Sequence, residues 1–286
     1  MRVGFLTHLL WDRYGPFWVG LARAGGAEVV RPDLEAVLAR LTDPRVAHAP
    51  AVAFRLAVAA ALALEDVDLI VVPRLNPERD GGPGAAQDPW IADLPATLER
   101  VRGAGPTIVP VAADLTGRLE TAAVSFLARL VHEPARVRRA WAQQRAAARA
   151  PRRAAPEGRV RPSEQRTVAV VGQPWLATPA VARLATRAGE QPLTPASFAP
   201  DDLRAEGRRA DPRLIDTDAE ALGAVRRFAR SAGVDEVRFV LDGGSGSDAW
   251  LARRAEALAH RRIEVVDLRS LADDEARLRA LIDAVG

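Results

Sequence analysis

Two side chains that could move a proton lie where the sequence predicts the end of a strand. His8 follows the apolar run Val3–Leu6, and Asp88 follows a loop rich in glycine and proline after the apolar run Val67–Val72. Imidazole and carboxylate groups are common general bases, and α/β sheets bind ligands at the carboxyl ends of their strands. His8 and Asp88 are therefore the candidate catalytic residues of a hydrolase or transferase. The sequence names no reaction and leaves open whether the protein is an enzyme.

A glycine-rich turn, LDGGSGSDA, lies at Leu241–Ala249 between a predicted strand and a predicted helix. Glycine lets the backbone approach a ligand, and the first amides of a helix attract an anion. Read from Gly244, the segment is G-x-G-x-x-A, and Asp267 ends the next strand at about the distance that a dinucleotide-binding fingerprint requires. The alternative is a structural turn in which Ser247 and Asp248 only cap the helix.

Residues for metal and thiol chemistry are scarce. The chain of 286 residues has no cysteine, which excludes disulfides, thiolate nucleophiles and the usual ligands of iron–sulfur clusters. Its four histidines show no metal-ligand spacing, so no metal site is predicted. A serine hydrolase of the G-x-S-x-G type would need glycine where Ser247 stands.

The elements that must position these residues follow an α/β pattern. Arg2–Val30 and Thr167–Leu193 each contain a short apolar run, a helical pattern and a second extended stretch, which indicates two similar halves. Alternating strands and helices predict parallel sheets, and we expect two Rossmann-like domains joined by a helical segment. The predicted boundaries are 1–115 and 164–286 for the domains and 116–163 for a helical connector with an Arg/Pro-rich linker. After a helix at Pro179–Arg187 and the extended stretch that ends at Leu193, the chain is expected to be irregular and charged up to Asp216, and Asp273–Ala284 is expected to be a helix.

The charge pattern gives a further hypothesis. All 40 basic residues are arginine, yet the net charge is only +3. Arginines are dense between Arg136 and Arg161, which would suit a nucleic-acid arm, but Trp141 is the only aromatic residue there. We interpret this stretch as a solvated helix face and linker. Without a signal peptide or a long apolar segment, the protein is expected to be cytoplasmic and not to contact a membrane.

Several short motifs, in order along the chain, resemble the 2-hydroxyacyl-CoA dehydratase and benzoyl-CoA reductase superfamily, especially its activase-associated component. Leu9-Leu10 and Tyr14-Gly15-Pro16-Phe17-Trp18 are similar to the family's opening, and Val67-Asp68 with Pro73-Arg74 to its second strand. The remaining matches are Asp88-Pro89 with Leu94-Pro95, Gly172-Gln173-Pro174-Trp175 and Gly244-Ser245-Gly246-Ser247-Asp248.

The departures from the family have one thing in common, which is the loss of cysteine. The resemblance places family cysteines at or next to Ala49, at Asp88 and at Ser245, and this chain has none of them. Family members hold an iron–sulfur cluster between two Rossmann-like domains and act on CoA thioesters. Because alanine cannot ligate iron and serine does so poorly, the resemblance implies a relative without the cluster or any other cofactor, and without redox chemistry.

The leading hypothesis is a protein that binds a small anion, such as a CoA ester or a nucleotide, or a partner protein in a cleft between the domains. A partner subunit or a second copy of the chain would complete the assembly. The alternatives are the hydrolase or transferase using His8 or Asp88, and the nucleic-acid-associated protein. The predicted ligand-binding residues are Thr7, His8, Trp11, Arg74, Asp88, Gln173, Trp175, Gly244, Ser245, Gly246, Ser247 and Asp248.

Overall fold

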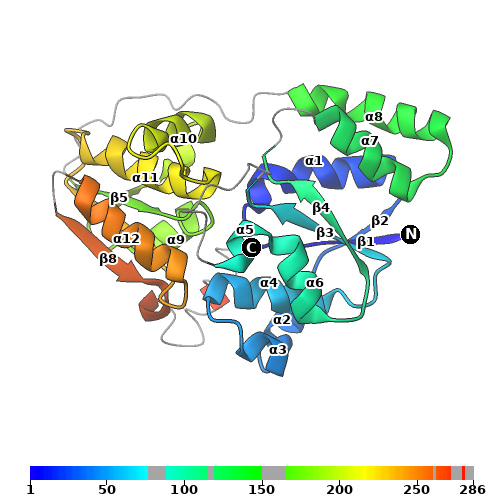
Figure 1. Ribbon diagram of the computed structural model, residues 1–286, viewed down its shortest axis with the longest axis horizontal. Helices are drawn as coiled ribbons and strands as arrows, with labels where there is room; N and C mark the ends of the chain where they lie inside the picture. The colour runs from blue at the N-terminus through cyan, green and yellow to red at the C-terminus, as the bar shows by residue number, and fades with distance from the viewer. Residues whose placement is uncertain (77–87, 115–118, 150–164, 260–261, 272–278, 281–286) are drawn as a thin grey trace. The chain divides into compact units, whose positions relative to one another are not determined.

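The computed structural model describes residues 1–76, 88–114, 119–149, 165–259, 262–271 and 279–280 (Figure 1). The chain divides into two compact units, and each is described by itself. Unit 1 contains Met1–Ala49, Ala53–Pro77 and Asp93–Arg152. Unit 2 contains Pro50–Val52, Glu78–Ala92 and Arg153–Gly286. Unit 2 is therefore built from the second half of the chain and two short segments of the first.

Unit 1 contains a four-stranded parallel sheet in the order β2-β1-β3-β4. Its elements, in chain order, are β1 (Arg2–Phe5), α1 (Trp11–Ala24), β2 (Glu28–Val30), α2 (Leu34–Arg40), α3 (Pro44–Ala47), α4 (Val52–Ala63), β3 (Leu69–Arg74), α6 (Leu94–Arg102), β4 (Thr107–Ala112), α7 (Leu119–Leu130) and α8 (Pro134–Arg149). β3 lies between β1 and β4, and its first five residues are buried, as the uniformly apolar sequence predicts for a central parallel strand.

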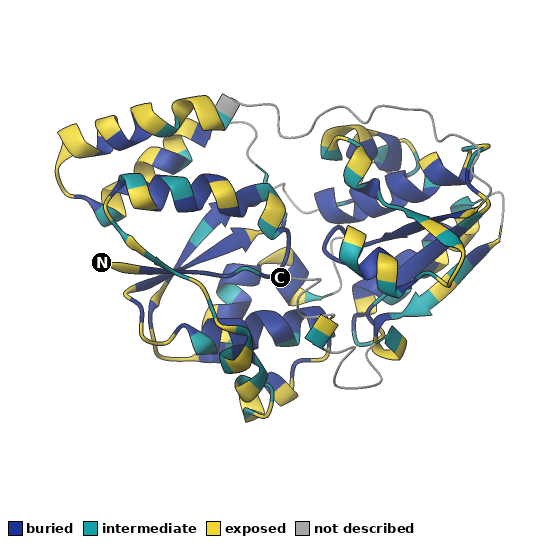
Figure 2. Cartoon of the chain, turned by 180° about the vertical axis from the view of Figure 1, so that it is seen from behind, coloured by how far each residue is buried: buried dark blue, intermediate teal, exposed yellow. Residues whose placement is uncertain are grey.

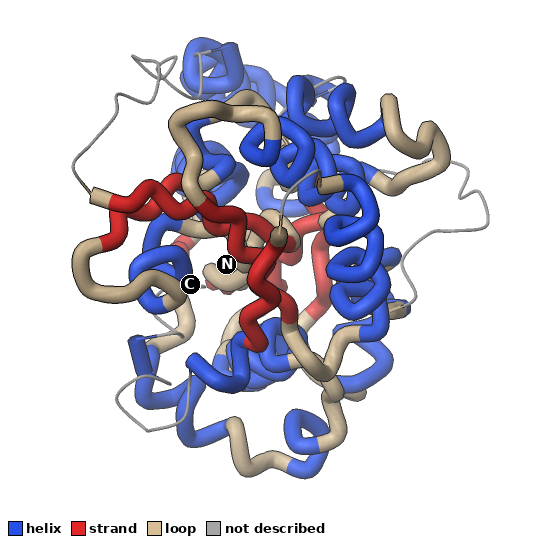
Figure 3. The backbone as a smooth tube through the Cα atoms, turned by 90° about the vertical axis from the view of Figure 1, so that its left-hand side faces the viewer, coloured by secondary structure: helices blue, strands red, loops and turns tan. Residues whose placement is uncertain are grey.

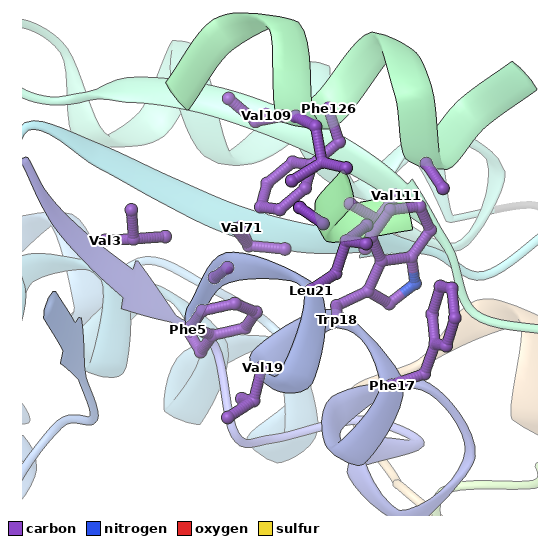
Figure 4. Packing of buried hydrophobic residues seen from close by; sticks show 14 of the residues in the cluster. Val3, Phe5, Phe17, Trp18, Val19, Leu21, Val71, Val109, Val111 and Phe126 are labelled. Carbon is purple, nitrogen blue, oxygen red and sulfur yellow. The ribbon is translucent and has the colours of Figure 1, made fainter. Parts of the chain in front are cut away.

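The core of unit 1 lies between this sheet and helices α1, α7 and α8. Phe5 and Val71 from the strands face Trp18 from α1 and Phe126 from α7 (Figure 4). The rings of Trp18 and Phe126 are 5.4 Å apart in an edge-to-face arrangement. Trp18 also donates a hydrogen bond from Nε1 to the carbonyl of Ala112, 3.1 Å away, which joins α1 to the end of β4.

Unit 2 contains a second four-stranded parallel sheet in the order β6-β5-β7-β8. Its elements are α5 (Pro89–Ala92), β5 (Arg166–Gly172), α9 (Pro179–Leu184), β6 (Glu190–Leu193), the 3₁₀ turn η1 (Pro195–Ser197), α10 (Pro200–Arg208), α11 (Asp216–Ala229), β7 (Glu236–Leu241), α12 (Gly246–Leu258), β8 (Ile263–Asp267) and the 3₁₀ turn η2 (Leu268–Leu271). The α/β fold with two Rossmann-like parallel sheets is confirmed.

One face of the second sheet packs against α10, α11 and α12. Val171 and Phe239 from the strands contact a cluster that includes Leu222 from α11 and Leu251 from α12. The central strands of both sheets are drawn buried in Figure 2. Helices α10 and α11 approach closely, because a Cβ atom on Gly223 would lie 1.8 Å from the carbonyl oxygen of Leu203. Only glycine fits at position 223.

The structure differs from the sequence prediction in three places. The charged stretch before Asp216 is not irregular, since it contains α10, whereas β6 matches the extended stretch expected to end at Leu193. The predicted helix near Ile91–Arg102 is two helices, separated at Asp93, whose side chain caps α6. The predicted connector contains α7 and α8, which pack in the core of unit 1 through residues such as Phe126 and Trp141. Figure 3 traces the backbone with the helices in blue and the strands in red.

Three predicted segments lie outside the described residues in whole or in most of their length. These are the loop at 76–87, the linker at 151–163 and the helix at 273–284. Among the helices in the described ranges, none combines the length and hydropathy that a membrane span requires.

Both sheets have the same switch point. In unit 1 the strands that follow β1 are added on its two opposite sides, as β2 and β3, and in unit 2 the same is true of β5, with β6 and β7. In open α/β sheets the ligand site lies beyond the carboxyl ends of the strands at this point. The segments after β1 and β3 in unit 1, and after β5 and β7 in unit 2, are therefore where the fold positions candidate residues.

Candidate functional site

The turn after β1 in unit 1 is almost entirely apolar. Leu9 and Leu10 are buried and have φ angles of 64° and 63°, which is unusual and strained for residues other than glycine. The hydroxyl of Tyr14 donates to the carbonyl of Leu6, and no side chain caps the first turn of α1. The side chains and the hydrogen bond of this turn are thus used within unit 1 itself.

His8 lies in the same turn and is only 3% exposed. Burial lowers the pKa of its imidazole to about 4, so the ring is neutral at physiological pH. Its Nδ1 atom has no hydrogen-bond partner within the described ranges. A buried imidazole with this pKa is a weak general base, so the geometry gives little support to His8 as a catalytic residue.

The other predicted residues of unit 1 do not gather around His8 in a recognisable site. Trp11 packs edge-on against Phe5 and Tyr14, with centroids 6.1 and 5.4 Å away, and the guanidinium of Arg31 lies 5.0 Å from its ring centroid. Trp11 is thus a packing residue of unit 1. Thr7 is partly buried, and Arg74 is exposed at the end of β3.

The switch point of unit 2 is polar, and its centre is the first turn of α12. Ser245 caps this helix, accepting a hydrogen bond at Oγ from the amide of Asp248 at 3.0 Å. A Cβ atom at the preceding Gly244 would lie 1.7 Å from the carbonyl oxygen of Pro50, so the close approach of Pro50 requires glycine there. Arg269 also donates to this carbonyl, at 3.1 Å.

The carboxylate of Asp88 lies at the N-terminus of α12. Its Oδ2 atom accepts from the Ser245 hydroxyl at 2.6 Å and the Ser247 amide at 3.2 Å, and its Oδ1 atom accepts from the Gly246 amide at 3.3 Å. The Asp88 amide in turn donates to Ser247 Oγ at 3.1 Å. The amides of a helix N-terminus and its dipole both favour a negative charge at this point. Asp88 is therefore an intramolecular anion bound where the fold would bind a phosphate.

No family model matches this sequence, and comparison with curated proteins and with solved structures finds no match.

Two buried acids lie beside this helix terminus. Asp248 is 1% exposed, and burial raises its pKa to about 8, with the charges of Asp242 and Asp88 acting in the same direction. Its Oδ2 atom accepts from the Asp242 amide at 2.9 Å, which directs the carboxyl group back into the β7–α12 turn, and its Oδ1 atom has no partner within the described residues. At neutral pH most molecules therefore carry Asp248 in its protonated, neutral form, which has a hydroxyl that can donate a hydrogen bond.

The second acid is Asp218, in the first turn of α11. Burial raises its pKa to about 7, and the charge of Asp88 acts in the same direction. Gln173, which follows β5, donates from Nε2 to Asp218 Oδ1 at 2.9 Å, and the Oε1 atom of Gln173 is buried without a partner in the described part of the chain. The sheet thus positions Asp218, whose pKa lies near 7, beside Gln173, whose buried Oε1 atom has no partner in the described residues.

The structure brings together most of the predicted residues of unit 2. Trp175 lies against Trp90, with ring centroids 5.3 Å apart, and both side chains are buried. Asp88, expected among the residues of the first half, belongs to unit 2 because its carboxylate binds α12. The residues of the site are Asp88, Trp90, Gln173, Trp175, Asp218, Asp242, Gly244, Ser245, Gly246, Ser247 and Asp248.

Sequence analysis missed three members of this site. Asp218 precedes an apolar helical run, where an acid is normally a solvent-exposed residue of the first turn, and Asp242 belongs to the glycine-rich motif but was given no role. Trp90 is adjacent to the Asp88-Pro89 pair, and that proximity was the available signal. Burial decides the roles of these side chains, and one sequence does not report it.

The donors at this site do not fit an iron–sulfur cluster. Asp88 and Ser245 offer oxygen in place of thiolate, and both carboxylate oxygens of Asp88 are engaged by the first turn of α12. Within the described ranges, no group of three or more histidine and acidic side chains is arranged to hold a metal ion.

Proposed function

We propose that the protein binds a small anionic molecule without redox chemistry, and that the β7–α12 turn of unit 2 takes its phosphate or carboxylate group. A CoA ester and a nucleotide both carry such a group. The observation that carries this proposal is the Asp88 carboxylate, which accepts three hydrogen bonds from Ser245, Gly246 and Ser247. A site that binds one carboxylate offers the donors that another anion needs.

Two further features support the proposal. The turn lies at the switch point of the sheet, where ligands of α/β proteins bind. Asp248 is mostly neutral at pH 7, so it adds a hydrogen-bond donor rather than a repelling charge. The family resemblance, which expects cysteines at residues 88 and 245 and at or next to Ala49, gives further support. Asp88 and Ser245 are hydrogen-bonded to each other, and Pro50, the residue after Ala49, lies against Gly244.

The experiment is a calorimetric titration with inorganic pyrophosphate, ATP, CoA and acetyl-CoA at pH 7, with adenosine and pantetheine as uncharged counterparts. Ser245→Ala removes one donor and should weaken binding of the charged compounds about tenfold. The matched control is Thr178→Ala, because Thr178 caps α9 of the same unit by the same kind of bond to Val181. Absence of binding by every charged compound, or an equal loss in both variants, would contradict the proposal.

A second candidate is an acid–base enzyme of the hydrolase or transferase class that uses Asp218. The observation that favours it is the pKa of Asp218, raised by burial to about 7, together with its hydrogen bond to Gln173. In this candidate the general base is Asp218 instead of His8 or Asp88, because a group with a pKa near 7 can both take up and release a proton at neutral pH. Asp218→Asn keeps the acceptor for Gln173, so it should abolish turnover of thioesters or phosphate esters while leaving the melting temperature at pH 6 unchanged. Equal turnover by the variant would exclude this role.

A further inference from the structure

The three donors at the N-terminus of α12 are all engaged by Asp88. The Ser245 hydroxyl and the amides of Gly246 and Ser247 each bind one of its carboxylate oxygens. A phosphate or carboxylate from a ligand would need the same donors, and two anions cannot share them at hydrogen-bond distance without strong repulsion. A ligand anion and Asp88 therefore exclude one another at this position.

We propose that Asp88 is a built-in competitor of the ligand, holding the anion position until a ligand anion displaces it. This inference rests on the proposed function, because it describes the regulation of the same site. A second observation, separate from the helix terminus, also points to a ligand: within the described residues, the Oδ1 atom of the buried Asp248 side chain has no hydrogen-bond partner. The Oδ2 atom of the same carboxyl group accepts from the Asp242 amide, so Oδ1 is left for a ligand.

Displacement of Asp88 has a mechanical consequence for Trp90. The two residues belong to one short turn, in which the Ile91 amide donates to the Asp88 carbonyl at 3.0 Å and α5 runs from Pro89 to Ala92. The amide of Asp88 is itself held by Ser247 Oγ. A ligand that removes the Asp88 carboxylate therefore loosens the contact of Trp90 with Trp175, and binding becomes visible as a change in tryptophan emission.

The affinity of the ligand measures the competition directly. When an internal group occupies the site for most of the time, the apparent dissociation constant is raised in proportion to that occupancy. Asp88→Asn keeps the size of the side chain and removes its charge, so pyrophosphate and CoA should bind about 10-fold to 100-fold more tightly than to the wild type. Asp93→Asn is the matched control, because Asp93 accepts from the Ala96 amide and so caps α6 of unit 1.

A second measurement needs only the wild-type protein. Hydrogen exchange in the presence of saturating pyrophosphate should become faster at residues 90–92, while the amides of Gly246 and Ser247 stay protected by the new anion. Tryptophan emission should shift to longer wavelength in the same titration, and the shift should be reduced in Trp90→Phe.

The outcomes separate the two proposals. Tighter binding by Asp88→Asn and faster exchange at residues 90–92 support internal competition. Equal affinities of the wild type and Asp88→Asn, with unchanged exchange, would overturn it and leave the proposed function in place. No binding by either protein would overturn the proposed function, and the competition with it.

Discussion

The two sheets have the same strand order, but the residues at their switch points differ in polarity: they are mostly apolar after β1 in unit 1 and mostly polar after β5 and β7 in unit 2. In unit 1 the turn is filled by Leu9 and Leu10, and its one titratable group, His8, is buried neutral. In unit 2 two buried acids, Asp248 in the first turn of α12 and Asp218 in the first turn of α11, lie near the Asp88 carboxylate. Topology supplies the place for a site, and the side chains decide whether it can bind a charged group.

The two turns also respond to pH in opposite directions. The folded pKa values of Asp218 and Asp248, about 7 and about 8, lie above the ordinary value of 3.8, so their contribution to stability is full below pH 4 and is lost as the pH rises to 7 and 8. The folded pKa of His8, about 4, lies below 6.5, so its contribution is full above pH 6.5 and is lost as the pH falls to 4.

The largest expected effect concerns the acids of unit 2. Asn at positions 218 and 248 keeps an acceptor for Gln173 and for the Asp242 amide but cannot ionise. The double variant should therefore be more stable than the wild type at pH 8, by on the order of 3 kcal/mol, and should lose this advantage at pH 4 to 5. Urea unfolding at the two pH values measures it. A constant difference between the proteins would show that the acids are not held neutral by folding.

The corresponding change in unit 1 is His8→Leu, which removes the imidazole. Between pH 6.5 and pH 5 the wild type should lose about 2 kcal/mol of stability at this residue, and the variant should not. Thermal unfolding over this range, with His132→Leu as an exposed control, checks the prediction. Parallel pH profiles of wild type and His8→Leu would contradict it.

Gly244→Ala tests the close contact between the Pro50 carbonyl and the β7–α12 turn. The new methyl group would overlap the Pro50 carbonyl, so residues 50–52 must shift, at a cost of about 2 kcal/mol. Gly20→Ala in α1 is the control, since a Cβ atom there would meet only the end of the Gln144 side chain. Denaturant midpoints compare the two variants, and equal midpoints would mean that Pro50 is not held against the turn.

The smallest expected effect is that of Tyr14→Phe in unit 1. It removes the hydrogen bond to the Leu6 carbonyl and keeps the ring, so the cost should be about 1 kcal/mol. Binding of anions by unit 2 should be unchanged. A loss of anion binding in Tyr14→Phe would show that the two turns do not act separately.

The sequence predicted the framework of the fold and part of the site. Apolar runs such as Val67–Val72 and the alternation of strands and helices indicated parallel sheets, because strands buried on both faces need such runs. The motif Gly244–Asp248 indicated a helix terminus with a possible anion. α10 was missed because the charged residues before Asp216 mask an amphipathic helix whose ion pairs, such as Arg204 with Glu220, form only after folding.

The role of Asp88 could not be predicted for a different reason. Its partner Ser245 is 157 residues away, and local patterns carry no information about such pairs. Asp218 was missed because an acid in the first turn of a helix is normally solvated, and only the packing around it shows that its pKa is raised.

The separation between Asp88 and Ser245 also has a consequence for synthesis. At about 5 to 20 residues per second, a ribosome needs roughly 8 to 30 s to make the 157 residues that separate the two partners. During that interval the nascent chain has Asp88 and Trp90 but lacks the helix that fixes them. The bonds between Asp88 and α12 therefore cannot form before the ribosome has made the residues of that helix.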